Sequence, residues 1–225
     1  MQIVLVRHGE PEWVKDGLNV GNPPLTDRGL RQAELASRRL HDEHWDEVVC
    51  SPLVRARQTA APLLRSLGFE ERTDEWLEEL RNPIWHGTPA EKLEAAFREQ
   101  RMLPSHQRWG GMEGAETMRN FVARIRTGCT EFLRQRGVAR QPGELPVWRI
   151  ENPGRRIALV AHAGTNSVII STLLGLPSVP WEWDRIVIGH ASITRLESFE
   201  MGDGHSFALT KLSDVEHLDP VDRSL

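Results

Sequence analysis

The stretch Ile3-Val4-Leu5-Val6-Arg7-His8-Gly9-Glu10 decides the fold. Its apolar half predicts a short buried strand, and its Arg-His pair stands at the end of that strand. In open α/β sheets the binding crevice lies at the carboxyl ends of the strands. A second apolar run, residues 157–161, ends in the same way at His162. The two runs therefore predict one pocket that holds two histidines.

The composition excludes several classes of protein. The chain has 225 residues, of which 27% are charged and 39% hydrophobic, as is ordinary for a soluble globular protein. Its net charge of -4 and the lack of any apolar run of ~18 residues argue against nucleic-acid binding and membrane insertion. Cys50 and Cys129 form no Cys-x-x-Cys pair, which argues against a structural zinc site. Without a signal peptide, the expected location is cytoplasmic.

Strand and helix patterns alternate along the chain, which predicts a single α/β domain over residues 1–225. Thr26 and Ser51, the latter followed by a proline, are expected to cap helices, and Gly68 to end the second one. Further segments are expected as helices at 89–101, 116–135 and 164–174 and as strands at 2–7, 47–50, 157–161, 186–188, 192–197 and 207–212.

The expected architecture is a three-layer α/β/α sandwich, with a mostly parallel sheet and an antiparallel strand near its end. Residues 81–113 are interpreted as an insertion over the active site, at the carboxyl edge of the sheet. Residues 137–155 carry three prolines and three glycines, which predicts an irregular surface excursion, either an interface element or a plain loop.

The Arg7-His8 pair suggests nucleophilic chemistry. A neutral imidazole is a competent nucleophile at physiological pH, and its attack on phosphorus gives a covalent phosphohistidine. The alternative is a histidine at a strand end that makes one hydrogen bond, and for an isolated pair that alternative is favoured.

Two further segments join a strand end to a helix and suit an anion. Arg55 lies about one turn into the helix after Ser51, where a guanidinium can hold a phosphoryl oxygen; Arg57 is better explained as an exposed or ion-paired residue. At His162-Ala163-Gly164, backbone N–H groups can bind an anion and a protonated His162 can share its charge. His162 as an ordinary buried histidine is the alternative.

Leu77-Glu78-Glu79-Leu80 supplies a candidate acid. A carboxyl group beside apolar surface can donate a proton near neutral pH. Glu79 is the first candidate and Glu78 the second, against the alternative of a solvated acidic pair.

Taken in order, these segments resemble the histidine phosphatase superfamily, also called the phosphoglycerate mutase-like family. The resemblance covers residues 2 to about 200 and also includes Pro24-Leu25-Thr26-Asp27-Arg28-Gly29 and Ala115-Glu116-Thr117 with Arg124. It implies that His8 is the nucleophile and that Glu79 is the proton donor. It also implies that Arg7, Arg55 and His162 hold the phosphoryl group, and that no metal or other cofactor is needed.

The chain departs from the family pattern in one place that concerns the phosphate. The family has an asparagine where this chain has Val14, and Asn19 and Asn22 are the candidates to replace it. The expected substrate-binding residues are Asn19, Gly21, Arg81, Ala163 and Gly164. Arginines and tryptophans of the insertion could bind an anionic or aromatic leaving group, or could be ordinary surface and core residues.

The resemblance implies a phosphoric monoester hydrolase of the histidine acid phosphatase type that acts on a small phosphorylated metabolite. A phosphoglycerate mutase-type phosphotransferase is the second hypothesis, and a non-catalytic phosphate-binding protein, suggested by Val14, is the third. Hydrolysis is favoured over transfer because the chain has no tyrosine, and so lacks the Glu-Arg-x-Tyr-Gly-like stretch of the mutases. Neither nucleic acid nor a membrane is expected as a partner, and a homodimer is left open.

Overall fold

The computed structural model describes residues 1–225 and is built on a seven-stranded sheet in the order β4-β7-β1-β8-β9-β6-β5. The strands are β1 (Gln2–Arg7), β4 (Glu47–Cys50), β5 (Val138–Arg140), β6 (Trp148–Ile150), β7 (Arg156–Ala161), β8 (Ile193–Met201) and β9 (Gly204–Asp214). Strands β4, β7 and β1 pair in parallel, and the remaining pairs are antiparallel. The antiparallel part is therefore larger than the one strand expected from the sequence.

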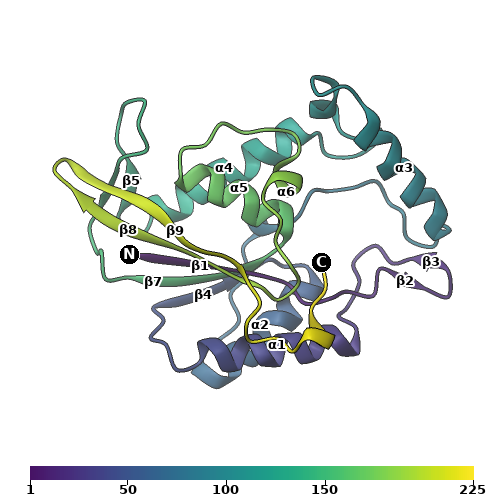
Figure 1. The fold of residues 1–225 in the computed structure, drawn as a ribbon, viewed down its shortest axis with the longest axis horizontal. Coiled ribbons are helices and arrows are strands. Elements are labelled where there is room, and N and C mark those ends of the chain that lie inside the picture. Colours follow the sequence, from purple (N-terminus) through teal and green to yellow (C-terminus); the bar gives the residue numbers. More distant parts are fainter.

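Helices cover both faces of this sheet, which confirms the three-layer α/β architecture (Figure 1). Helices α1 (Asp27–Leu40) and α2 (Val54–Leu67) lie on one face, and α4 (Met118–Arg134) and α5 (Ala163–Leu173) lie on the other. Short α6 (Glu182–Arg185) packs beside α5.

The alternation of side chains along β1 explains why both faces must be covered. Ile3 and Leu5 belong to the core under α4 and α5, whereas Val4 and Val6 belong to the core under α1 and α2. Successive residues of a strand point to opposite faces, so a run of four apolar residues buries both. The four apolar residues thus place β1 in the centre of the molecule. Its polar last residue, Arg7, lies at the carboxyl end of the parallel strands.

The helix ends confirm some of the expected caps and correct another. Thr26 accepts from the backbone N–H of Gly29 at 3.0 Å, and Gly68 ends α2 in the left-handed conformation, at φ 68°. Ser51 does not cap α2, because the helix begins only after Leu53. The hydroxyl of Ser51 contacts His162 instead, at 2.8 Å.

Two expectations about the second half of the chain were wrong. Within 137–155, expected to be irregular, β5 and β6 extend the sheet at its edge. The apolar run 186–188 forms no strand. Its backbone carbonyls instead accept hydrogen bonds from side chains of neighbouring elements. The Ile186 carbonyl accepts from Ser167 at 3.1 Å, and the Ile188 carbonyl accepts from Arg7.

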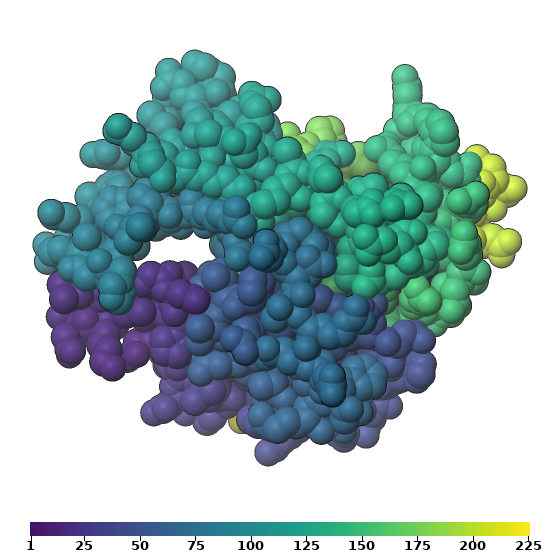
Figure 2. Space-filling model, turned by 180° about the vertical axis from the view of Figure 1, so that it is seen from behind, coloured from purple at the N-terminus to yellow at the C-terminus, as the bar shows by residue number.

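The insertion over residues 81–113 contains α3 (Ala90–Met102) and meets a small hairpin, β2 (Val14–Lys15) and β3 (Leu18–Asn19). The backbone N–H of Asn19 donates to Thr88 at 2.8 Å, and the N–H of Ala90 donates to Gly17 at 3.1 Å. In Figure 2 the hairpin, in purple, and this segment, in blue to teal, close around an opening. The two segments form a bridge at the carboxyl side of the sheet.

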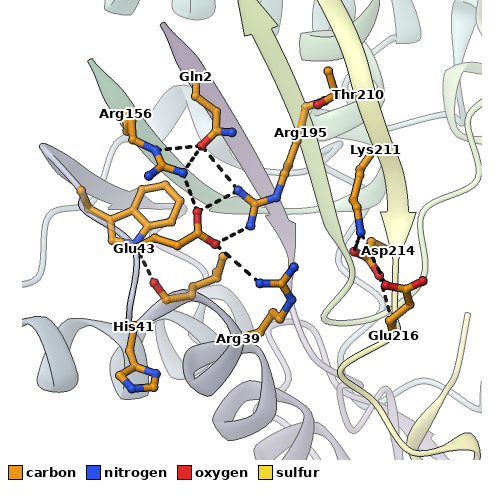
Figure 3. A network of polar contacts seen from close by, with 12 residues as sticks. Gln2, Arg39, His41, Glu43, Arg156, Arg195, Thr210, Lys211, Asp214 and Glu216 are labelled. Carbon is orange, nitrogen blue, oxygen red and sulfur yellow. Dashed lines mark hydrogen bonds and ion pairs between the residues drawn. The ribbon is translucent and has the colours of Figure 1, made fainter. Parts of the chain in front are cut away.

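The opposite side of the sheet is closed by ion pairs centred on Glu43 (Figure 3). Its carboxylate contacts Arg195 and Arg156, each at 2.6 Å, and Arg39 at 3.8 Å. Gln2 accepts from Arg156 at 2.7 Å. This Glu43 network fixes the loop after α1 to the beginnings of β1 and β7.

The two edges of the sheet are short. At one edge, β5 has three residues. At the other, β4 is followed by a single parallel bridge from Cys50 to Thr73. None of the helices has the length and apolar character needed to cross a membrane.

Candidate active site

The site forms where two adjacent parallel strands end. Arg7 and Ala161, the last residues of β1 and β7, are paired in register, and a histidine follows each of them. The ring centroids of His8 and His162 are 5.1 Å apart. The structure therefore brings both histidines together at the carboxyl ends of these two strands.

His8 presents one free ring nitrogen. Its Nδ1 lies 2.7 Å from the carbonyl oxygen of Gly9, and because a carbonyl can only accept, Nδ1 must carry the proton. Burial lowers the pKa of His8 well below its usual value, and the side chains of His162, Arg55 and Arg7 lower it further. His8 is thus a neutral imidazole whose Nε2 keeps its lone pair.

His162 caps α5 and is completely buried. Its Nε2 contacts the Ser51 hydroxyl, while its Nδ1 is buried and has no protein partner. When the Ser51 hydroxyl donates to Nε2, the ring proton lies on Nδ1, and this N–H is then free to bind an anion. Burial, followed by the charges of Arg55 and Arg7, lowers the pKa of His162, so the ring is neutral here rather than protonated as expected from the sequence.

Arg7 and Arg55 supply the positive charge of the pocket. Arg55 is 4% exposed in the first turn of α2, and Arg7 donates to the carbonyl of Ile188. In both guanidinium groups Nε is buried without a protein partner. Burial is the main reason that their pKa values fall to about 10, so both remain charged at neutral pH. The indole of Trp13 lies 4.8 Å from the Arg55 guanidinium and covers it at the rim.

Glu79 lies against the start of α5, at Gly164, two residues after His162. Its carboxylate accepts from the backbone N–H of Gly164 at 2.9 Å and from that of Leu80 at 3.0 Å. Its charge partly offsets the fall in the pKa of both Arg7 and Arg55, which shows that it lies near them. Glu79 is therefore part of the site.

The rival carboxylate and arginine of the sequence analysis lie in ion pairs. Glu78 contacts Arg81 at 2.8 Å. Arg81 is one of the expected substrate-binding residues, and this ion pair holds it at an exposed position. Arg57 contacts Glu71 at 2.8 Å on the surface.

The remaining expected binding residues divide into two groups. Ala163 and Gly164 begin α5 beside His162 and Glu79. Asn19 instead donates its side-chain amide to Thr88 and Pro89, each contact at 3.1 Å, and the Gly21 N–H donates to His86 at 3.3 Å. Asn19 and Gly21 therefore join the two segments of the bridge to each other.

Asn22, the other candidate to replace the missing asparagine, lies at the start of α2. Its side-chain oxygen accepts from the backbone N–H of Val54 at 3.2 Å. This contact places Asn22 at the first residue of α2, directly before Arg55.

Sequence reasoning missed His190. It is 5% exposed, its ring centroid lies 5.6 Å from that of His8, and its Nε2 lies 2.9 Å from Nη2 of Arg7. Because β8 is antiparallel to β1, the residues before β8 lie beside the end of β1. A histidine just before an antiparallel strand was the available signal, but the neighbouring run 186–188 was interpreted as a strand of its own.

The pocket combines the groups that phosphoryl transfer requires: an unprotonated imidazole, two buried guanidinium groups and a carboxyl group near them. No cluster of three or more His, Cys, Asp or Glu side chains is arranged to hold a metal ion. The charges present can stabilise the equatorial oxygens of a transferring phosphoryl group.

Comparison with known proteins gives the same family throughout. The sequence profile of the histidine phosphatase superfamily (branch 1) matches residues 3–211. The chain is 29% identical to "Probable phosphoglycerate mutase GpmB" of Yersinia enterocolitica, over 97% of this chain and 95% of that protein.

Solved structures agree in fold. A mycobacterial glucosyl-3-phosphoglycerate phosphatase in complex with inorganic phosphate superimposes with a TM-score of 0.71 at 25% identity, covering 97% of this chain and 99% of that one. The alpha-ribazole phosphatase of Shigella flexneri has a TM-score of 0.70 at 22% identity, covers 95% and 96% of the two chains, and supports the fold only. With the matched profile, the paired histidines and the shared architecture, this chain belongs to the histidine phosphatase superfamily.

Proposed function

We propose that the protein is a phosphomonoesterase that acts on a small phosphorylated metabolite through a phosphohistidine at His8, without a metal ion. The observation that carries the proposal is the state of His8: Nδ1–H is committed to the Gly9 carbonyl, and Nε2 is left unprotonated beside the charges of two buried arginines. The family membership and the phosphatases among the structural neighbours support it.

The first chemical step forms a bond between Nε2 of His8 and phosphorus. The ester P–O bond breaks, its electron pair moves to the leaving oxygen, and Glu79 supplies the proton that makes this oxygen an alcohol. Arg7, Arg55 and Nδ1–H of His162 neutralise the phosphoryl oxygens during the transfer.

The second step releases inorganic phosphate. Glu79, now a carboxylate, takes a proton from a water molecule that attacks phosphorus, and the P–N bond to His8 breaks with its electron pair returning to Nε2. The hydrogen bonds from Gly164 and Leu80 hold the carboxyl group for both steps.

The test is hydrolysis of p-nitrophenyl phosphate by the protein and by His8→Ala. We expect the substitution to abolish turnover, and an alkaline quench of the wild type during turnover to trap a base-stable, acid-labile phosphoryl group on His8. The matched control is His44→Ala, a histidine that is 76% exposed and lies at the other side of the sheet. Equal activity of wild type and His8→Ala would contradict the role of His8 as the nucleophile. No activity in either protein would contradict the proposal and favour a non-catalytic phosphate-binding role.

A mutase is the second candidate, because the curated relatives carry that name. The two activities separate when the protein is given 3-phosphoglycerate with a bisphosphoglycerate primer. A hydrolase releases phosphate, whereas faster formation of 2-phosphoglycerate would identify a mutase. A panel of sugar phosphates, phosphoglycerates, nucleotides and phosphopeptides then narrows the substrate.

A further inference from the structure

His190 is a third histidine of the pocket, and the reaction steps above do not use it. Its ring is buried and lies 5.6 Å from that of His8. The ring contacts Arg7 on one side and Ser224, near the end of the chain, on the other.

These two contacts fix the proton on one ring nitrogen. A guanidinium has only donors, so Nε2 of His190 must accept from Nη2 of Arg7, 2.9 Å away. The ring proton then lies on Nδ1, which is 3.0 Å from the hydroxyl oxygen of Ser224 and donates to it. Burial, with the charges of Arg7 and Arg55, lowers the pKa of His190 to about 3, which agrees with a neutral ring.

Ser224 is itself held firmly. Its carbonyl accepts from the backbone N–H of His190 at 3.0 Å, and its hydroxyl accepts from the amide nitrogen of Gln32 at 3.1 Å. Gln32 is fully buried, and its amide oxygen accepts from the backbone N–H of Glu10 at 2.7 Å.

The circuit ends at Glu10. The Gln32 amide links the Ser224 hydroxyl to the backbone N–H of Glu10, and Ser224 accepts a hydrogen bond from Nδ1–H of His190. The circuit runs from the guanidinium just before His8 to the residue two positions after it.

We propose that His190, held with its proton on Nδ1 by Ser224, is a positioning residue that orients the Arg7 guanidinium toward the phosphoryl group. Two acceptors, the Ile188 carbonyl and Nε2 of His190, hold the two terminal nitrogens of Arg7. The buried Nε–H, which has no protein partner, is left for a phosphoryl oxygen. This inference rests on the proposed function, because it assigns Arg7 to the phosphoryl group.

The test compares His190→Ala, His190→Asn and Ser224→Ala in hydrolysis of p-nitrophenyl phosphate and in calorimetric binding of inorganic phosphate. Because misplacing a binding group by 1 Å can cost about 100-fold, we expect His190→Ala to lower kcat/KM by roughly 10- to 100-fold. Ser224→Ala should lower it several-fold. His190→Asn should recover most of the loss, because its amide can accept from Arg7 and donate to Ser224. Ser206→Ala, a half-buried serine on β9, is the matched control and should leave both measurements unchanged.

Two readouts separate positioning from general stability. If His190 acts through Arg7, then adding His190→Ala to Arg7→Ala should cause no further loss. In ¹⁵N NMR of the wild type, Nδ1 of His190 should have the chemical shift of a protonated ring nitrogen, and Arg7→Ala should mix the two tautomers, because it removes the donor that makes Nε2 the acceptor. A full additional loss in the Arg7→Ala background, or a proton on Nε2, would overturn the inference.

The phosphate-binding arm distinguishes a failure of this inference from a failure of the proposed function. A wild type that hydrolyses no phosphomonoester would contradict the proposed function alone, and weaker binding of inorganic phosphate to His190→Ala would still support the positioning role. An active wild type with unchanged kcat and phosphate affinity in His190→Ala would contradict the positioning role alone. If His190→Ala does not fold, Ser224→Ala and the NMR tautomer decide in the same way.

Discussion

The Glu79 carboxyl group can occupy its position because residue 164 is a glycine and has no side chain. A Cβ atom at position 164 would lie 2.5 Å from Oε1 of Glu79 and 2.9 Å from the Trp183 ring. Glycine therefore lets the carboxyl group accept the N–H of the same residue at 2.9 Å, between the start of α5 and an indole. At this position the requirement for glycine comes from the close approach of the acid, since its backbone is in an ordinary helical conformation.

Gly164→Ala should therefore displace the acid without disturbing the nucleophile. We expect kcat to fall by about 10- to 100-fold, because the proton donor is moved from the leaving oxygen, and stability to fall by about 1–3 kcal/mol from overpacking. Steady-state kinetics and chemical denaturation measure the two effects. Gly202→Ala is the control, since a Cβ there meets nothing within 4 Å. Wild-type kcat in Gly164→Ala would show that Glu79 does not need this position.

Glu79→Gln tests the role of the same carboxyl group. An amide cannot protonate the leaving oxygen, so esters with poor leaving groups should lose about 100-fold or more in rate, and activated aryl esters much less. Hydrolysis of an alkyl phosphate and of p-nitrophenyl phosphate by the variant gives the comparison. Similar losses on both substrates would count against Glu79 as the proton donor.

Among the elements, the β2–β3 hairpin and the segment before α3 depend on each other. Each is too short to be stable alone, and they meet through backbone hydrogen bonds and the buried Asn19 amide. Trp13, just before the hairpin, covers Arg55 at the rim of the pocket. Movement of the bridge is thus coupled to the mouth of the site.

Asn19→Ala should loosen this bridge. Thr88 and Pro89 would lose the donor that now contacts them at 3.1 Å, so we expect faster hydrogen exchange in both segments and a KM that is raised several-fold. Exchange measured by mass spectrometry locates the change, and the exposed Asn120→Ala is the control. If exchange in both segments stayed at the wild-type rate, the amide would not be what joins them.

The elements that could be predicted from the sequence are those with a strong local pattern. The apolar runs of β1 and β7 and the capped amphipathic helix α1 stand where they were expected. By contrast, β5 and β6 have only three residues each, too few for a period to show. The run 186–188 has the composition of a strand, but its carbonyls are used by α5 and Arg7.

The residues of the site could be predicted where they belong to elements with a strong local pattern. His8, Arg55 and His162 follow strand ends or begin helices, so the topology of the sheet brings them together. His190 lies in a loop, and its place depends on the antiparallel pairing of β8, which the sequence does not specify. Asn19 was expected to bind substrate, whereas its amide joins the hairpin to Thr88 and Pro89. No local sequence pattern signals such a contact between distant segments.

On the scale of the whole molecule, the Glu43 network should contribute to stability and leave catalysis alone. Glu43→Gln leaves the mostly buried Arg195 without its carboxylate, so we expect the free energy of unfolding to fall by about 2 kcal/mol, less than for a fully buried pair. kcat should not change, because the network lies at the other side of the sheet. Denaturant unfolding measures the first, with Glu216→Gln, an exposed ion-pair partner, as the control. A loss of kcat without a loss of stability would contradict this assignment.

The buried histidines make the stability of the whole fold depend on pH. The pKa values of His8, His162 and His190 are lowered by burial, so these rings stay neutral in the folded protein, whereas in the unfolded chain they bind protons near pH 6.5. The free energy of unfolding therefore has its full value above pH 6.5. Below that pH it falls, by at most about 1.4 kcal/mol per pH unit for each ring.

Denaturant unfolding between pH 7 and pH 5 measures this slope, above the range in which carboxylates titrate. His190→Asn should reduce the slope by one histidine. A free energy of unfolding that is level across this range would show that the three rings are protonated in the folded state.

The shortness of both sheet edges bears on how the protein behaves in concentrated solution. An unpaired strand offers its backbone as a template to a second chain, and long flat edges invite fibrous association. Here β5 ends at Arg140, two residues before Pro142, and β4 has only four residues, with one bridge from Cys50 to Thr73. Each edge therefore offers a second chain only a short stretch of unpaired backbone.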